Sequence, residues 1–168
     1  MAGTATNIPG ISSLGVKFGY AVETTKGTKP TKFIQLERCN TINGISLETE
    51  TIDASALEDM QTRSIAGRQD TGGTWAVTFN FTPDVAKQLK KMIQAAKTGK
   101  TSSFNTWFEV WNPNTPDNAF FVVAEPPALL PMPEVSQNGL QTIELTFTIN
   151  EYKGDDEGIE PEIEDTTL

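Results

Sequence analysis

A few short motifs in this 168-residue chain carry residue types that could do chemistry. The segment Lys97-Thr98-Gly99-Lys100-Thr101 contains the Gly-Lys-Thr end of a phosphate-binding loop, but Gln94 stands where the first glycine of that motif belongs. The motif also needs a strand that runs into a helix, whereas this pattern runs from a helix into a strand. The sequence therefore does not predict a nucleotide site.

Two pairs of carboxylates could in principle serve acid/base or metal chemistry. Glu48 and Glu50 lie two apart and share one side of a strand, and Glu58 adjoins Asp59. Nothing around either pair predicts the burial that a catalytic carboxylate needs, so we interpret them as solvated groups or as a shared electrostatic surface. An enzyme that uses carboxylates alone is kept as an alternative.

The composition excludes several familiar chemistries. Histidine is absent and Cys39 is the single cysteine, so a Ser-His-Asp relay, an internal disulfide and a cysteine or histidine zinc site cannot be built. Arg38 next to Cys39 could activate the thiol, although a single cysteine at a strand end is more often a packing residue. We predict no catalytic residue, no metal site and no cofactor, and hence a protein that is not an enzyme.

The net charge of −9 is concentrated at one end of the chain. Residues 151–168 hold eight acidic residues and one lysine, which is seven of the nine net negative charges. With a pI near 4.5 and no basic run, tight binding to a phosphate backbone is disfavoured. Neither a signal peptide nor an apolar run of membrane-spanning length is visible, so we expect no membrane association and folding in a reducing cytoplasm.

Alternation with a period of two dominates the sequence and predicts half-buried strands. It is clearest at residues 16–22, 74–81 and 142–150, where large apolar residues fall on every second position. Further strands are expected at 32–38 and 45–52, separated by the turn signal Asn43-Gly44. The sequence thus indicates a mainly β protein.

One helix is expected at about residues 82–98. Thr82 can cap it, Pro83 suits its first turn, and Lys97 with Gly99 marks its end. Its apolar residues follow helical spacing on one face, so we expect it to pack on the outside of a sheet.

Three other regions complete the expected organisation. Strands at 104–111 and 118–124 are aromatic on both faces and need cover from a second layer of the domain or from another subunit. Residues 53–73 form a long, mixed-charge connection, of a length usually tied to function. Residues 151–168 form an acidic tail too poor in apolar groups to fold alone.

This order of elements resembles the major tail tube proteins of long-tailed, siphophage-type bacteriophages, whose fold is shared with contractile-phage and type VI secretion tubes. Gly44-Ile45-Ser46-Leu47-Glu48-Thr49-Glu50 resembles the strand before the long loop of that family. Ile65-Ala66-Gly67-Arg68 and Asp70-Thr71-Gly72-Gly73 resemble the return of the loop into the next strand, which has the pattern of Trp75, Val77, Phe79 and Phe81. The resemblance covers residues 14–150, by pattern and element order.

The resemblance implies a β-sandwich or barrel-like tail tube fold with one flanking helix. It implies a structural virion protein whose hexameric rings stack into the tube of a phage tail, the conduit for DNA ejection. Implied partners are further copies of the chain and the tape measure, tail terminator and distal tail proteins, while DNA passes through the lumen without specific binding. Residues 1–13 would be an N-terminal arm and 14–150 the tube domain, with no appended immunoglobulin-like domain.

Candidate site residues follow from the polar faces of the expected strands, from the charges of the long connection and from the aromatic strands. The candidate lumen-facing carboxylates are Glu48, Glu50 and Glu144. The residues expected at contacts between subunits or rings are Glu58, Asp59, Arg63, Arg68, Asp70, Trp107 and Trp111.

Two other binding roles are kept open. One is another ring protein on the same fold, such as a distal tail or connector protein. The other is a carbohydrate-binding β-sandwich, for which Trp107 and Trp111 would be the sugar platform. Aromatic stacking on nucleic-acid bases is disfavoured because residues 101–150 contain no basic side chain.

Overall fold

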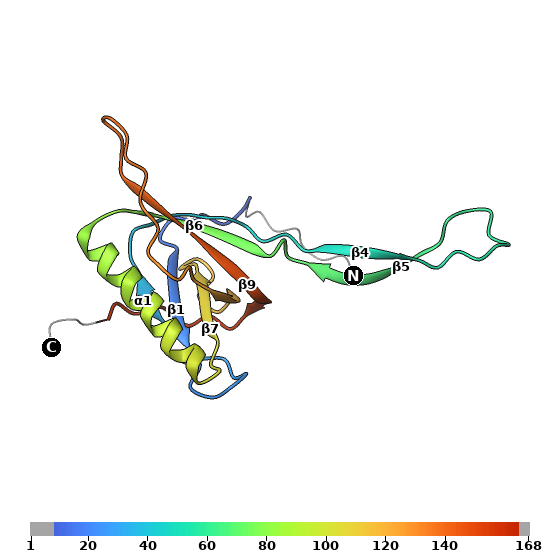
Figure 1. Ribbon diagram of the computed structural model, residues 1–168, viewed down its shortest axis with the longest axis horizontal. Helices are drawn as coiled ribbons and strands as arrows, with labels where there is room; N and C mark the ends of the chain where they lie inside the picture. The colour runs from blue at the N-terminus through green and yellow to red at the C-terminus, as the bar shows by residue number, and fades with distance from the viewer. Residues whose placement is uncertain (1–8, 165–168) are drawn as a thin grey trace.

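The computed structural model describes residues 9–164 and is built mainly of β-strands (Figure 1). Seven strands form one antiparallel sheet in the order β2-β1-β7-β8-β9-β6-β3, and β4 pairs with β5 in a separate hairpin. The elements are β1 (Lys17–Val22), β2 (Ile34–Leu36), β3 (Cys39–Ile42), β4 (Glu48–Asp53), β5 (Ser64–Asp70), β6 (Thr74–Asn80), α1 (Pro83–Thr101), β7 (Thr106–Trp111), β8 (Ala119–Glu125) and β9 (Thr142–Asp156).

The large sheet curls so that its two halves face each other. Three strands separate β1 from β6 in the sheet, yet the rings of Phe18 in β1 and Phe79 in β6 lie 5.9 Å apart. Phe108 of β7 and Phe147 of β9 meet in the same core, with ring centroids 4.6 Å apart. The predicted mainly β, sandwich-like fold with one flanking helix is confirmed.

Helix α1 covers this core, as its spacing predicts. Thr82 caps it by accepting a hydrogen bond from the Val85 N–H at 3.2 Å, and Asp84 lies at the positive end of the helix dipole. The face that packs against the sheet consists of Val85, Leu89, Met92, Ile93, Ala96 and Gly99. Within residues 9–164, no helix is both long enough and apolar enough to cross a membrane.

The end of the helix differs from the prediction at 98. Gly99 lies inside the helix and is buried against β1, where an added Cβ would come within about 2.5 Å of the Val22 side chain. Its role is therefore close packing, and the helix continues to Thr101. The turn that follows uses Ser103 in the left-handed region, with a φ of 60°.

Both faces of the aromatic strands are covered by the chain itself. One face of β7 and β8 joins the main core through Phe108 and Val122. The opposite face forms a second apolar cluster of Ala21, Phe33, Trp107, Trp111, Ala119, Phe121 and Val123, with Ile159 packed against it. The sequence predicts cover from a second layer of the domain or from another subunit. The structure shows the second layer of the same domain.

Two strands were missed by the sequence analysis, and both change the connectivity. Strand β3 pairs with β6, and β5 pairs with β4, so the segments at 32–38 and 45–52 do not pair with each other. Residues 64–70 of the long connection form β5, which leaves 54–63 as the loop proper. The connection at 53–73 therefore supplies the loop and the second strand of the β4–β5 hairpin.

The acidic C-terminal segment is ordered on its own subunit. Strand β9 continues to Asp156, and the chain then returns to the edge of the sheet, where Gln35 donates to the Glu162 carbonyl at 2.7 Å. Carboxylates of this segment meet lysines of the body, including Lys17 with Glu160 and Lys91 with Glu164, both at 2.7 Å. The expected boundary at residue 150 thus falls inside a strand, while residues 1–8 and 165–168 of the two expected terminal segments lie outside the described residues.

Candidate assembly surfaces

The β4–β5 hairpin projects far from the body of the subunit (Figure 1). Every residue of β4 is exposed, and so is every residue of β5 except a half-buried Gly67, because neither face has a second layer. The tip carries two large apolar side chains, Leu57 and Met60, that are essentially fully exposed. A two-stranded hairpin is marginally stable alone in water, so this geometry is typical of a segment that packs against another molecule.

Most of the predicted contact residues lie on this hairpin. Near the tip, the Arg63 Nε donates to the Asp59 carboxylate at 3.0 Å, and Glu58 is exposed beside them. Closer to the body, Arg68 approaches Glu50 at 4.0 Å. Such pairs contribute little to stability, and the exposed Arg63, Arg68 and Glu50 are available to a neighbour. The Asp59 side chain is only 17% exposed and also accepts a hydrogen bond from the Ala56 N–H at 2.8 Å, so it acts within the loop.

Asp70 has a local structural role. Its carboxylate accepts a hydrogen bond from the Gly72 N–H at 2.9 Å, at the point where β5 turns into β6. Gly72 and Gly73 both have a positive φ there, of 85° and 78°, which favours glycine. This turn sets the direction in which the hairpin leaves the sheet.

Trp107 and Trp111 are not available on the surface. They are 6% and 7% exposed in the single chain and belong to the second apolar cluster. The Trp111 indole N–H also donates to the Pro116 carbonyl at 3.2 Å. Neither indole can form a sugar platform, and little of either is left for contact with another subunit.

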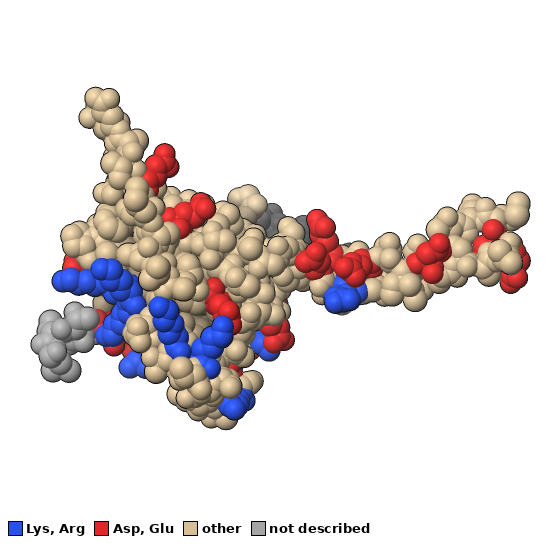
Figure 2. Space-filling view, in the orientation of Figure 1, with Lys and Arg blue, Asp and Glu red and all other residues tan. Residues whose placement is uncertain are grey.

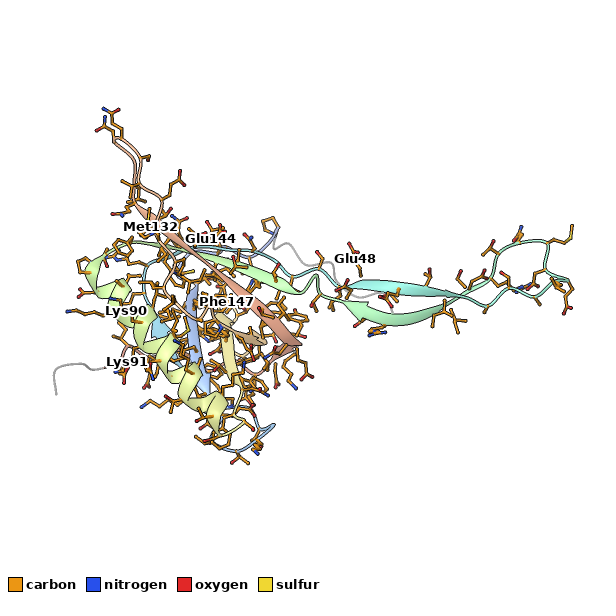
Figure 3. The ribbon with its side chains drawn as sticks, viewed as in Figure 1. Glu48, Lys90, Lys91, Met132, Glu144 and Phe147 are labelled. Atoms are coloured by element: carbon orange, nitrogen blue, oxygen red, sulfur yellow. The ribbon has the colours of Figure 1, made fainter. Side chains whose placement is uncertain are left out.

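The outer face of β6 and β9 is polar and exposed. It carries Glu144, which lies opposite Thr78 in the ladder between these strands. Around it are small polar residues of the same face, namely Thr74, Thr146 and Thr148. Glu48 and Glu50 lie on β4 of the hairpin, so the structure separates them from Glu144 (Figure 3).

A second projection, residues 126–141 between β8 and β9, was missed by the sequence analysis. It contains no regular secondary structure and exposes four large apolar side chains, Leu129, Met132, Val135 and Leu140. The available signal was a 16-residue, proline-containing connection between two strands, a length that is uncommon inside a compact domain.

One carboxyl group has a strongly perturbed environment. Glu109 on β7 is completely buried, and burial raises its pKa to about 7. Its Oε1 accepts a hydrogen bond from the Ile159 N–H at 2.8 Å, which holds the C-terminal segment over the second cluster. Its Oε2 is buried without a hydrogen-bond partner among the described residues, so the ionised form is disfavoured and the group has no access to a substrate.

Metal-binding side chains do not gather at any point in residues 9–164. No three of their acidic and cysteine side chains lie close enough to hold an ion. Cys39 is half-buried, and burial raises the pKa of its thiol to about 12, which disfavours the reactive thiolate.

The fold is similar to that of chains in solved structures. A chain from the tail of an empty GTA particle, refined helically with C6 symmetry, superposes with a TM-score of 0.53 at 13% identity, over 86% of this chain and 98% of its own. A chain from the six-fold symmetrised baseplate of the anti-feeding prophage covers 92% of this chain and 99% of its own, with a TM-score of 0.49 at 13% identity.

These likenesses are of fold alone. No family model matches the sequence, and no curated protein is similar enough to it to count as a relative.

Proposed function

We propose that this chain is a non-enzymatic structural protein of a bacteriophage-type tail that assembles into stacked six-membered rings. The rings form a tube, located in the virion tail and assembled in the host cytoplasm, through which DNA is ejected. The observation that carries the proposal is the β4–β5 hairpin, a projecting two-stranded ribbon with Leu57 and Met60 exposed at its tip. Such a ribbon needs a partner, and identical subunits supply one at every position of a tube.

The free edges of the strands support ring closure. Within the described residues, the outer edge of β3 has no partner strand, and neither do the outer edges of β4 and β5. The opposite edge of the sheet, at β2, is bridged to Glu162 of the C-terminal segment. Unpaired edges favour pairing with another chain, and a closed ring of subunits removes them.

The polar outer face of β6 and β9 supports a wet lumen. Threonine side chains and Glu144 are exposed there, while the alternate positions Ile143, Leu145 and Phe147 are completely buried. In a ring, each carboxylate of this face would recur once per subunit. Negative charge repels the phosphates of DNA, so DNA would slide past without binding.

The distribution of charge fits the same arrangement. Figure 2 shows lysines gathered over α1 and both signs of charge along the hairpin. A hairpin with Arg63 and Arg68 among several carboxylates suits contact with another ring by mixed ion pairs. The likeness of fold to a chain of a C6-symmetric particle tail supports the six-fold order.

The remaining partners would be other tail proteins, namely the tape measure, tail terminator and distal tail proteins. A second candidate function is a single ring, as in a distal tail or connector protein. The exposed hairpin tip favours the tube, because a ring that does not stack leaves Leu57 and Met60 in water.

Negative-stain electron microscopy combined with sedimentation velocity of the purified protein tests the proposal. We expect rings or open-ended tubes that grow with protein concentration. Single rings at every concentration would support the second candidate. A monomer at every concentration, with no tubes after seeding by fragments of native tails, would overturn both.

A further inference from the structure

The projection at residues 126–141, called here the proline arm, has a composition unlike the rest of the chain. It contains four of the ten prolines and one charged residue, Glu134, in a chain that is 21% charged. Met132, near the middle of the arm, is 87% exposed. In Figure 2 the arm is almost entirely tan, the colour of residues other than Lys, Arg, Asp and Glu. Closely spaced prolines favour an extended backbone, so little conformational entropy is lost when such a segment binds.

An uncharged groove of about 870 Å³ lies elsewhere on the subunit. It opens beside the free edge of β3 and is lined by Cys39, Ile42, Trp75, Phe120 and Tyr152, among others. None of the described residues that line it is charged, and Phe120 is 48% exposed. Aromatic-lined grooves are the surfaces on which proline-rich, extended segments bind.

The arm and the groove lie towards opposite ends of the same strand pair. The arm leaves β8 after Glu125 and returns at Thr142, the first residue of β9. The groove contains Phe120 near the start of β8 and Tyr152 near the end of β9. The arm projects from the body at one end of this strand pair (Figure 1), and the groove lies towards the other end.

We propose that the proline arm of one copy docks in the groove of the next copy. The inference rests on the proposed self-assembly and names the surfaces that it uses. The groove is uncharged and Glu134 is the one charged residue of the arm, so the apolar side chains of the arm can enter the groove while that carboxylate stays in water. Because the contact joins two different surfaces, it is head-to-tail and propagates from subunit to subunit, as a ring or a helical stack requires.

The single native cysteine makes the contact directly measurable. Cys39 lines the groove, so a cysteine placed on the arm can form a disulfide with Cys39 of another copy only if the arm reaches the groove. Leu129→Cys, Met132→Cys and Val135→Cys would each be oxidised with copper phenanthroline at pH 8.5 in assembled and in concentrated soluble protein. Because burial raises the pKa of the Cys39 thiol, the same three variants would also be made with Asn43→Cys, an exposed position of the same groove, as the acceptor in place of Cys39. Gln94→Cys on the exposed face of α1 is the matched control, and Cys39→Ser in the Met132→Cys background removes the acceptor.

With a cysteine at position 39 or 43 of the groove, we expect at least one arm variant to give disulfide-linked multimers at ten or more times the yield of the Gln94→Cys control, and none when the groove holds no cysteine. Linked copies without tubes would support the docking and count against the proposed tube. Tubes in which no arm variant links above the control would overturn the docking alone. A disulfide within one chain, seen as loss of free thiols without a larger species, would also overturn it.

A charge placed on the arm provides a second readout that does not depend on thiol chemistry. Met132→Glu should lower the extent of assembly at least fivefold, because a carboxylate would have to enter an uncharged groove. Its melting temperature should match the parent, since Met132 is in water in the single subunit. Unchanged assembly of this variant would contradict the docking.

Discussion

Glu109 shows how one residue couples the C-terminal segment to the pH. Its carboxyl group is completely buried, and the pKa is raised from 4.5 to about 7, chiefly by burial, with Lys29 and the Ile159 N–H acting in the opposite direction. Between these two values the folded state binds the proton more tightly than the unfolded state. The free energy of unfolding therefore rises, through this group, as the pH falls from about 8 towards 4.5.

Glu109→Gln should remove this contribution. A neutral side chain at this position cannot be ionised, so the variant should gain stability relative to the parent at pH 8 and lose that advantage near pH 4.5. The relative change should approach about 3 kcal/mol, from roughly 1.4 kcal/mol per pKa unit. Urea denaturation of both proteins across this range measures it, with Glu144→Gln on the exposed face as the control. A constant difference between parent and Glu109→Gln would contradict the assignment.

Glu144 is the residue through which the polar face can be tested for contact with DNA. Glu144→Lys should assemble normally, because the side chain is exposed, but should place a cation on the tube wall once per subunit. Such tubes should co-sediment with DNA at 50 mM salt and release it by 200 mM, an affinity loss of about a thousandfold or more for six or more phosphate contacts. Gln94→Lys on α1 is the matched control. DNA retention by the control and not by Glu144→Lys would place the polar face outside.

Residues whose roles depend on neighbours in sequence were predictable, and those that depend on distant packing were not. Thr82 caps α1 as expected because a cap is a local device. The sequence predicts Gly99 at the end of the helix. In the structure it is a packing residue, in close contact with Val22, which is 77 residues away in the sequence. Trp107 and Trp111 were expected at a surface because their cover comes from Phe33 and Ile159 in irregular segments.

Among the elements, the β4–β5 hairpin most clearly indicates a binding partner, because it projects from the body and its residues are almost all exposed. Leu57→Glu together with Met60→Glu should leave the melting temperature of the subunit within about 1 °C, since both side chains are already in water. The same variant should lower tube formation at least tenfold, because the tip would no longer bury apolar surface against a neighbour. Light scattering and electron microscopy measure this, with Gln94→Glu as the charge control. Normal tubes would make the tip a solvated loop.

The C-terminal segment is an element that stabilises its own subunit. A chain ending at Asp156 would keep β9 but lose Ile159, the buried Pro161 and the backbone bonds of Glu162 to Phe33 and Gln35. We expect the free energy of unfolding to fall by roughly 3 kcal/mol, and the second cluster to become accessible to a hydrophobic dye. Retained stability with an earlier onset of polymerisation would instead favour charge repulsion as the role of the segment.

Strand β5 shows why one element escaped the sequence analysis. Alternation of apolar and polar residues appears where one face of a strand is buried, as in β6 and β9. Both faces of β5 are in water, so its residues Ser64–Asp70 carry no such pattern. A strand that depends on pairing alone leaves only weak evidence in its own sequence.

For the whole molecule, the sequence predicts the fold class but does not predict the proline arm or the uncharged groove. The buried faces of β1, β6 and β9 and the amphipathic helix predict a mainly β sandwich, because those patterns record burial directly. The proline arm and the uncharged groove depend on the path of the chain through a curled sheet, which no local pattern encodes.

A cryo-electron microscopy reconstruction of the assembled protein tests the central claim most directly. The account predicts six subunits per ring, stacked rings, the β6–β9 face with Glu144 towards the lumen, and each β4–β5 hairpin packed against another subunit. A protein that stays monomeric under all conditions, or a tube in which the β6–β9 face lies on the outer wall and the hairpins contact nothing, would contradict it.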